Sequence, residues 1–272
     1  MTKKDKENLI KAAHAGGAVL KKYFGKTLNL VQKSTIVDFQ TEADLGSEKA
    51  ILTILKKEFP KYNTHSEEGG KFHNGSDYTF VIDPLDGTNN FVLGIPNFCV
   101  SIALFHKERA IAGIIYQPLL DQTYFAELGK GAKLNGKKIK VSKLTQLNKI
   151  SIAYTGGYLT SHDRFRSMLN NLMKLEQKRI LFNWCPTFDC CLVASGKIES
   201  LVSDYGLELH DFGAGKLIAQ EAGAQVIDMK DGKKEANYKN DGFIISNNSK
   251  NNNYIFNNAV KLAQKGRVLK HN

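Results

Sequence analysis

The sequence lacks any cysteine pattern typical of a zinc site or a disulfide framework. It has only four cysteines among 272 residues, namely Cys99, Cys185, Cys190 and Cys191. None of them forms a Cys-x-x-Cys pair, and two adjacent cysteines are poorly placed to share a metal ion or a disulfide. We therefore expect reduced, buried thiols, as in a cytoplasmic protein.

The sequence also lacks a segment that could enter a membrane. Its N-terminal stretch, MTKKDKENLIKAAHAGG, is charged and contains no apolar signal core. The longest apolar stretch, residues 91–105, is interrupted by Gly94, Pro96 and Asn97 and is shorter than a membrane span. These absences predict a soluble, cytoplasmic protein with no membrane partner.

Positive charge is abundant, but no nucleic-acid-binding pattern accompanies it. Lysine and arginine number 38 against 27 acidic residues, which gives a formal net charge of +11. Such an excess can attract nucleic acid. The lysines are scattered, however, and the sequence has no compact arginine-rich run. Because charge alone is a weak signal, we do not expect nucleic acid to be the partner.

The first half of the chain is predicted to begin with helices and to continue with strands. Apolar spacing predicts one helix around residues 9–24 and a second over 42–59, with Leu45, Ile51, Leu52 and Leu55 on one face. A short strand and loop are expected between them, at 28–41. Four closely connected strands, which we expect to form antiparallel hairpins, are predicted at 78–83, 98–105, 110–118 and 122–128.

The second half alternates between the two kinds of element. Strands are predicted at 150–154, 198–204, 224–229 and 242–247, and helices at 162–178, 186–195, 211–223 and 251–265. The chain is long enough for one large domain or two closely packed halves. We predict a single domain over 1–272, α+β over about 1–148 and α/β over about 149–272, packed as alternating layers of helices and sheets.

The motif VIDPLDGT places two carboxylates where a buried strand is expected to end. Asp83 and Asp86 lie three residues apart across a predicted turn. In one interpretation this is an ordinary Asp-Gly turn with solvated carboxylates. In the other it is a Mg²⁺ site, because Mg²⁺ prefers oxygen ligands and the carbonyl of Leu85 could supply one more.

The residues after the two aspartates favour the second interpretation. Gly87 and Thr88 are expected to open a helix whose free backbone amides face the same point. Such amides favour a phosphate group. Metal-binding carboxylates beside an anion-binding helix start are typical of a site for phosphoryl chemistry.

Three further acidic stretches support a metal site, although each has a simpler explanation. Glu67 and Glu68 precede a glycine pair in a predicted loop, where acidic side chains are commonly solvated. Asp44 lies at the start of one helix and Asp211 at the start of a glycine-rich helix. Both aspartates suit helix capping.

Together these four stretches resemble the inositol monophosphatase family of Mg²⁺-dependent phosphomonoesterases. The resemblance covers nearly the whole chain and includes the GIPNFCVSIAL strand and the GKGAKLNGKKIKVS hairpin. The D-P-L-D-G-T signature, with E-E-G upstream and a helix-opening aspartate downstream, is highly specific. The resemblance implies a layered fold, a homodimer, Mg²⁺ as cofactor and inhibition by Li⁺.

The resemblance also implies metal ligands at the matching positions. A first Mg²⁺ would be held by Glu67, Asp83 and the carbonyl of Leu85. A second would be held by Asp83, Asp86 and Asp211, and a weaker third ion would lie near Glu67. The physical chemistry agrees, because clustered carboxylates repel one another and divalent cations cancel that charge.

Roles in catalysis and substrate binding follow from the same resemblance. Asp44 and Thr88 match the pair that orients and activates the attacking water, and Glu67 is a further catalytic candidate. The implied contacts to the phosphate ester are Asp86, Gly87, Thr88 and Asp204. No cysteine or histidine nucleophile is required.

Two positions depart from the family's usual pattern. His210 replaces a tryptophan before Asp211, either as a packing substitute or as a substrate contact. The stretch NWCPT, at 183–187, replaces a pattern of arginine followed by Gly-Ser/Thr-Ala-Ala, whereas Asp189 fits. Because this segment normally lines the substrate pocket near a subunit interface, it bears on both substrate choice and dimer geometry.

The implied substrate is a small phosphate ester. The family includes hydrolases for inositol phosphates, histidinol phosphate, fructose 1,6-bisphosphate and 3′-phosphoadenosine 5′-phosphate. The continuation TNNF after the signature favours inositol 1-phosphate, cleaved to inositol and phosphate. An alternative is a binding role, because some bacterial relatives join transcription antitermination complexes through RNA polymerase partners. The net positive charge permits that role without indicating it.

Overall fold

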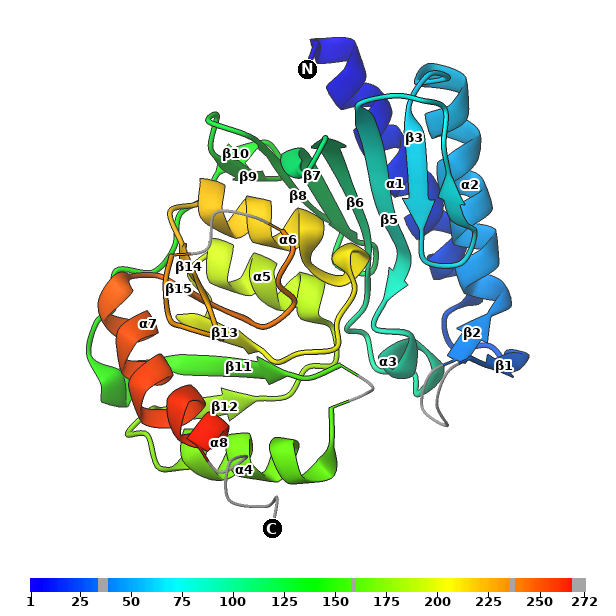
Figure 1. Cartoon of the computed structure of the whole chain (residues 1–272). Helices are drawn as coiled ribbons and strands as arrows, with labels where there is room; N and C mark the ends of the chain where they lie inside the picture. The colour runs from blue at the N-terminus through cyan, green and yellow to red at the C-terminus, as the bar shows by residue number, and fades with distance from the viewer. Residues whose placement is uncertain (34–38, 158–159, 235–237, 266–272) are drawn as a thin grey trace.

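The fold consists of alternating layers of helices and sheets, as the sequence predicted. The structure, a computed structural model, describes residues 1–33, 39–157, 160–234 and 238–265. Helices α1 (Lys3–Tyr23) and α2 (Glu42–Glu58) cover one face of an eight-stranded sheet (Figure 1). Between this sheet and a five-stranded sheet lie α5 (Pro186–Ala194) and α6 (Leu209–Glu221). The far side of the second sheet is covered by α4 (His162–Met173), α7 (Ser249–Ile255), the π-helical segment η2 (Phe256–Val260) and α8 (Lys261–Lys265).

The eight-stranded sheet is antiparallel apart from one pair. Its strands in spatial order are β10 (Lys137–Lys138), β9 (Ala132–Leu134), β8 (Gln122–Glu127), β7 (Arg109–Gln117), β6 (Cys99–His106), β5 (Tyr78–Asp86), β3 (Asn63–Ser66) and β4 (Gly70–Phe72). Only β3 and β5 run parallel. The antiparallel hairpins predicted from the short connections are thus confirmed, whereas β3 and β4, which contain few apolar residues, were not predicted.

The five-stranded sheet combines parallel and antiparallel pairs. Its order is β12 (Arg179–Leu181), β11 (Ser151–Thr155), β13 (Ser200–Ser203), β15 (Phe243–Ser246) and β14 (Gln225–Asp228). Strands β12, β11 and β13 are parallel, so their carboxyl ends share one edge. The short strand β12 was not predicted. Three short elements lie outside both sheets: the pair β1 (Leu30–Gln32) and β2 (Phe39–Thr41), and the 3-10 turn η1 (Leu147–Lys149).

Alternating side chains of the first sheet fill two separate hydrophobic cores. On β6, Ile102 and Leu104 pack in the core shared with α1 and α2. Their neighbours Ala103 and Phe105 pack in the core shared with α5 and α6. This alternation follows from the period of two in a strand. Because both faces of β6 are buried, the strand is mostly apolar on both faces rather than amphipathic.

One glycine allows α6 to lie close to the sheet. A side chain at Gly113 in β7 would place its Cβ 3.0 Å from the backbone oxygen of Ala214. A side chain at position 113 would push α6, whose first turn contains Asp211, away from the sheet. The close packing of α6 therefore depends on the absence of a side chain in β7.

The buried face of α2 differs from the one predicted. Leu45 is 48% exposed, whereas Asp44, Ser47 and Glu48 are buried together with Ile51. Apolar spacing alone could not indicate this, because these polar side chains are buried through hydrogen bonds to neighbouring elements. The polar part of α2 faces the end of β5 and the turn between β3 and β4.

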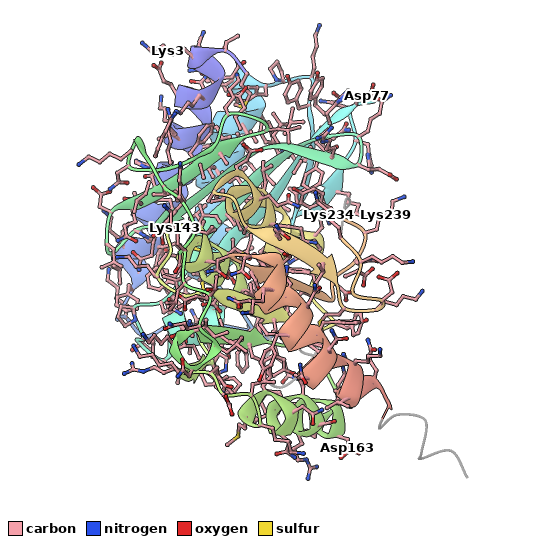
Figure 2. The ribbon with its side chains drawn as sticks, turned by 90° about the vertical axis from the view of Figure 1, so that its left-hand side faces the viewer. Lys3, Asp77, Lys143, Asp163, Lys234 and Lys239 are labelled. Atoms are coloured by element: carbon pink, nitrogen blue, oxygen red, sulfur yellow. The ribbon has the colours of Figure 1, made fainter. Side chains whose placement is uncertain are left out.

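No helix within the described parts of the chain is long and apolar enough to cross a membrane. The lysines are spread over the surface: Figure 2 shows Lys3, Lys143 and Lys234 on separate parts of the molecule. The two sheets are formed by residues on either side of positions 148 and 149. Since α6 packs against the first sheet, we propose that both halves form one domain.

Candidate active site

The site is built around an irregularity in β5. Residues three apart in a regular strand point to opposite faces of the sheet. Here Asp83 pairs with Ser101 and Asp86 with Cys99, so three steps along β5 match two steps along β6. This β-bulge turns both aspartates toward the same face. The strand therefore continues through the DPLD motif, contrary to the prediction that it ends there.

The bulge is followed by a backbone conformation that requires glycine. Gly87 has a φ of 90°, in the left-handed region, and a Cβ there would lie 2.8 Å from the backbone oxygen of Asn97. The short helix α3 (Thr88–Val92) begins directly after it, as predicted. The glycine thus redirects the chain from the strand into the helix beside both aspartates.

Asp86 is held by the second half of the chain. Its Oδ2 accepts a hydrogen bond from the backbone N of Thr187 at 2.9 Å and one from Sγ of Cys185 at 3.1 Å. Thr187 in turn donates from Oγ1 to the backbone oxygen of Asp211 at 2.7 Å. The first turns of α5 and α6 therefore meet the end of β5, and Asp86 and Asp211 come within electrostatic range of each other.

Asp211 combines a helix cap with a position at the site. Its Oδ2 accepts a hydrogen bond from the backbone N of Glu208 at 2.7 Å and completes a capping box. Its Oδ1 lies 3.6 Å from Nε2 of His210. The capping bond thus uses only one oxygen of the carboxylate. His210 is 7% exposed, which favours a packing role over a substrate contact.

Glu67 and Glu68 lie in the turn between β3 and β4. The backbone N of Glu67 donates to the oxygen of Ile82 at 3.0 Å, which fixes the turn beside β5. Nζ of Lys33 lies 2.7 Å from Glu67 Oε1 and 3.0 Å from Glu68 Oε1. Burial alone would lower the pKa of Lys33, but the two carboxylates raise it above its usual value. Sequence reasoning missed Lys33, because nothing in its local pattern links it to residues more than thirty positions away.

Helix α2 fixes this turn and the bulge relative to each other. Ser47 donates from Oγ to the backbone oxygen of Pro84 at 2.8 Å. The carboxylate of Glu48 accepts hydrogen bonds from the backbone N of Gly69, at 2.8 Å, and from Oγ of Ser66. One turn of α2 therefore holds the DPLD segment and the turn that carries Glu67.

Asp44 and Thr88 are in contact. Oγ1 of Thr88 lies 3.3 Å from Oδ1 of Asp44 and 3.0 Å from the backbone oxygen of Leu85. The other oxygen of Asp44, Oδ2, accepts hydrogen bonds from the N and Oγ1 of Thr41 at 2.9 and 2.5 Å. Thr41 is thus the N-cap of α2, and Asp44 closes its capping box. Capping and contact with Thr88 use different oxygens of Asp44.

The acidic side chains perturb one another electrostatically. Burial raises the pKa of Asp83 well above its usual range, and the charges of Glu67, Asp86 and Asp211 raise it further. Burial also raises the pKa of Asp86 to about 7, although hydrogen bonds from Cys185 and Thr187 oppose the change. Burial raises the pKa of Asp44 to about 7 as well. These mutual effects show that the carboxylates share one low-dielectric region.

The donor set of this region suits a hard divalent cation. Its oxygen donors are the carboxylates of Glu67, Asp83, Asp86 and Asp211 and the carbonyl of Leu85. Mg²⁺ prefers oxygen ligands, and its charge would offset the repulsion that raises the pKa values of the buried carboxyl groups. The residues present therefore fit the Mg²⁺ site that the sequence predicted.

Asp204 is not brought into this group. It is fully buried at the end of β13, where Oδ1 lies 2.7 Å from Nε and 2.6 Å from Nη2 of Arg164. Its Oδ2 accepts a hydrogen bond from the hydroxyl of Tyr154 at 3.2 Å. Because both oxygens are engaged inside the protein, the structure does not favour Asp204 as a substrate contact.

The unusual segment 183–187 borders the site. Trp184 has a φ of 51°, in the left-handed region, and its side chain is 57% exposed. The backbone oxygen of Asn183 accepts hydrogen bonds from Nδ2 of Asn90 and Nδ2 of Asn97, each at 2.7 Å. The tryptophan is therefore held by its backbone next to Cys185, while its indole ring faces solvent.

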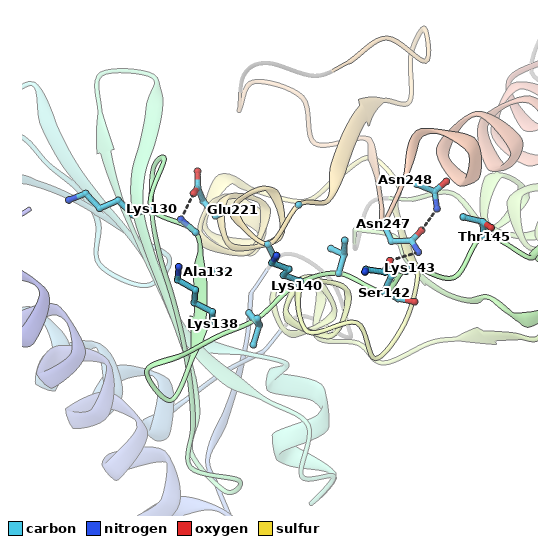
Figure 3. A pocket seen from close by; sticks show the side chains of 15 residues that line it. Lys130, Ala132, Lys138, Lys140, Ser142, Lys143, Thr145, Glu221, Asn247 and Asn248 are labelled. Atoms are coloured by element: carbon cyan, nitrogen blue, oxygen red, sulfur yellow. Dashed lines mark hydrogen bonds between the residues drawn. The ribbon is translucent and has the colours of Figure 1, made fainter.

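A cavity of about 680 Å³, shown in Figure 3, is lined by Glu221 and several lysines but by none of the candidate metal ligands. It is lined by the β9–β10 hairpin, the residues that follow it and the end of α6. Lys138, Lys140 and Lys143 line it, and among the described residues no carboxylate forms an ion pair with them. The cavity is therefore basic and separate from the candidate active site.

Comparisons with known proteins identify relatives of this chain. The model of the inositol monophosphatase family matches residues 3–264. The Nus factor SuhB of Pasteurella multocida is 35% identical over 82% of this chain and 84% of its own. A fructose-1,6-bisphosphatase/inositol-1-monophosphatase of Thermotoga maritima is 33% identical over 88% of this chain and 89% of its own.

A solved structure shows the same fold. The extragenic suppressor protein SuhB from Bartonella henselae superposes with a TM-score of 0.87 and 31% sequence identity. The superposition covers 94% of this chain and 98% of that one. The chain therefore belongs to the inositol monophosphatase family of phosphatases.

Proposed function

We propose that the protein is a Mg²⁺-dependent phosphomonoesterase that cleaves inositol 1-phosphate to inositol and phosphate. The observation that carries this proposal is the meeting of Glu67, Asp83, Asp86 and Asp211 around the bulge in β5. A relative named as a fructose-1,6-bisphosphatase/inositol-1-monophosphatase supports the substrate class. Lithium sensitivity, a homodimer and a cytoplasmic location belong to the same proposal.

The ligands proposed for Mg²⁺ are those inferred from the sequence. Glu67, Asp83 and the carbonyl of Leu85 would hold one ion, and Asp83, Asp86 and Asp211 a second. When bound, these cations supply charge that stabilises the oxygens entering and leaving the phosphorus. Gly87 and Thr88, at the start of α3, would position the phosphate group through their backbone amides.

The pair formed by Asp44 and Thr88 would orient and activate the attacking water. Thr88 has one hydroxyl proton and lies within reach of Asp44 Oδ1 and Leu85 O. When Thr88 donates to Asp44, its oxygen is free to accept a hydrogen bond from the water. As the water loses a proton to Thr88, Thr88 would pass its own hydroxyl proton to Asp44. The raised pKa of Asp44, about 7, suits a group that takes up a proton near neutral pH.

Phosphate release tests the proposed activity. We expect release from inositol 1-phosphate in MgCl₂, loss of activity with EDTA, and weaker inhibition by NaCl than by LiCl. Asp83→Asn should lower kcat on the order of 10²–10⁴-fold, because it removes a carboxylate that would help to hold both cations. The same assay over fructose 1,6-bisphosphate, histidinol phosphate and 3′-phosphoadenosine 5′-phosphate ranks the substrates.

A matched control for Asp83→Asn is Asp163→Asn, which removes an exposed carboxylate on α4. This variant should retain full activity. Activity that persists in EDTA, or in Asp83→Asn, would contradict the metal-dependent mechanism.

Thermal stability tests the metal site without substrate. Carboxyl groups with raised pKa values stabilise the metal-free fold fully below about pH 4, their ordinary pKa, and this contribution is lost as the pH rises toward 7. Mg²⁺ binds the deprotonated carboxylates, so it should raise the melting temperature more at pH 8 than at pH 5. The measurement is a melting curve at each pH in MgCl₂ and in NaCl of equal ionic strength. If the two salts give the same melting temperature at pH 5 and also at pH 8, the site is excluded.

Asp44→Asn tests the water-activating pair. We expect kcat to fall about 10²–10⁴-fold, as for a lost general base, while KM changes little. Asp5→Asn is the matched control, because Asp5 closes the equivalent capping box of α1, remote from the site. Each change should cost about 1 kcal/mol of stability. If Asp44→Asn retains the activity of Asp5→Asn, then Asp44 serves only as a cap.

A partner-binding role is a second candidate function. A relative is named as a Nus factor, and the basic cavity in Figure 3 is separate from the acidic site. We propose that this cavity contacts a component of a transcription complex through an acidic segment. Lys138, Lys140 and Lys143, which form no ion pair with a carboxylate in the described part of the chain, provide the complementary charge.

Charge reversal at the cavity tests this second role. The double variant Lys138→Glu/Lys140→Glu should lose RNA polymerase subunits from a pull-down while its phosphatase activity is unchanged. The control reverses two exposed lysines of α1, in Lys4→Glu/Lys11→Glu. Nuclease treatment separates protein contacts from nucleic acid. Equal capture by both double variants would exclude the cavity as the contact.

A further inference from the structure

Two buried thiols lie next to the carboxylate of Asp86. Cys99 begins β6 and Cys185 precedes α5, yet their sulfur atoms are only 3.9 Å apart. Oδ2 of Asp86 lies 3.1 Å from Sγ of Cys185 and 3.8 Å from Sγ of Cys99. Both cysteines are fully buried, and Asp86 is 4% exposed. The proposed hydrolysis of phosphate esters uses neither thiol.

The ordinary role of these thiols is to orient Asp86. Burial raises the pKa of Cys99 to about 11 and that of Cys185 well above its usual value, so both are protonated near neutral pH. Each can donate a weak hydrogen bond to the carboxylate. This role accounts for each contact separately. It does not explain why the two sulfur atoms also lie within 3.9 Å of each other.

The spacing of the three atoms matches a tetrahedral metal site. With metal–sulfur bonds of about 2.3 Å and metal–oxygen bonds of about 2.0–2.2 Å, tetrahedral angles place two sulfurs about 3.8 Å apart and a sulfur and an oxygen about 3.6 Å apart. The observed separations are 3.9 Å between the sulfurs, and 3.1 and 3.8 Å from sulfur to oxygen. Shifts of a few tenths of an ångström would therefore suffice for one ion to contact all three atoms. The backbone oxygen of Asp86, 3.5 Å from Sγ of Cys185, offers a fourth donor.

We propose that Asp86, Cys99 and Cys185 form a binding site for a thiophilic divalent cation such as Zn²⁺ or Cd²⁺. Thiolate ligands select such ions, whereas Mg²⁺ requires oxygen donors. Binding forms two metal–sulfur bonds and releases both thiol protons to water, with no change of oxidation state. The ion draws the carboxylate of Asp86 toward the thiols and away from the proposed Mg²⁺ position. The cation therefore inhibits the enzyme by moving a proposed Mg²⁺ ligand, without occupying the proposed Mg²⁺ position itself.

The effect on activity rests on the proposed function, whereas the binding does not. A second group of residues that could hold a cation, His65, Glu208 and His210, contains no sulfur. Absorption from cadmium–thiolate charge transfer in the ultraviolet therefore reports only on the thiol site. His65→Gln weakens the histidine group and should leave this absorption unchanged.

Cadmium titration of the metal-free, reduced protein tests the site. We expect the charge-transfer band to saturate near one equivalent of Cd²⁺. The band should disappear in Cys99→Ser/Cys185→Ser, where hydroxyl groups can still donate hydrogen bonds to Asp86. It should persist in Cys191→Ser, the matched control, because Cys191 is equally buried but belongs to neither group of ligands. If the double variant fails to fold, Cys185→Ser alone should reduce the band at least by half.

Inhibition by Zn²⁺ in excess MgCl₂ provides the second measurement. The double variant should require at least tenfold more Zn²⁺ for half-inhibition than the unmodified protein or Cys191→Ser. No band in the unmodified protein, or equal bands in the double variant and the control, would overturn the proposed site. A band in a protein without phosphatase activity would instead leave this site standing and refute the proposed function.

Discussion

The repulsion between buried carboxylates is the constraint on which the rest of this structure depends. Asp83 and Asp86 are almost fully removed from water, and Glu67 and Asp211 lie close enough to raise the pKa of Asp83. Removing such groups from water is costly unless opposite charge or hydrogen bonds compensate. Lys33 supplies one positive charge on the Glu67 side. The remaining negative charge is what the proposed Mg²⁺ ions would offset.

The surrounding fold holds these repelling groups together through backbone hydrogen bonds and helix ends. Asp44 and Asp211 each use one oxygen to close a capping box, and the other oxygen lies near Thr88 in Asp44 and near His210 in Asp211. Asp86 is fixed by the first turn of α5, and the turn that carries Glu67 is fixed by Glu48 of α2. Each helix that contributes a carboxylate is therefore anchored at the point where that carboxylate emerges. Preorganisation of this kind keeps the donors in place when a cation binds or leaves.

The sequence predicted most helices and the antiparallel strands because their apolar patterns are strong. It also predicted contact between Asp44 and Thr88, from a family resemblance rather than from local pattern. It did not predict β3 and β4, which contain few apolar residues, or β12, which is only three residues long. The buried face of α2 was assigned incorrectly at Leu45, since Asp44, Ser47 and Glu48 are buried by hydrogen bonds that helical periodicity cannot reveal. The bulge in β5 was missed because register depends on the partner strand.

The sequence by itself determined which chemistry this protein has available. The paired aspartates with the glycine after them, the E-E-G stretch and a helix-opening aspartate supply oxygen donors and the helix start that we propose to bind phosphate. Only the tertiary structure decided how those groups are used. It placed Asp204 in an ion pair with Arg164, brought Lys33 to Glu67, and set two thiols from distant segments behind Asp86. The physical reason is that distances between residues far apart in the chain are fixed by packing of the layers, and no local pattern encodes them.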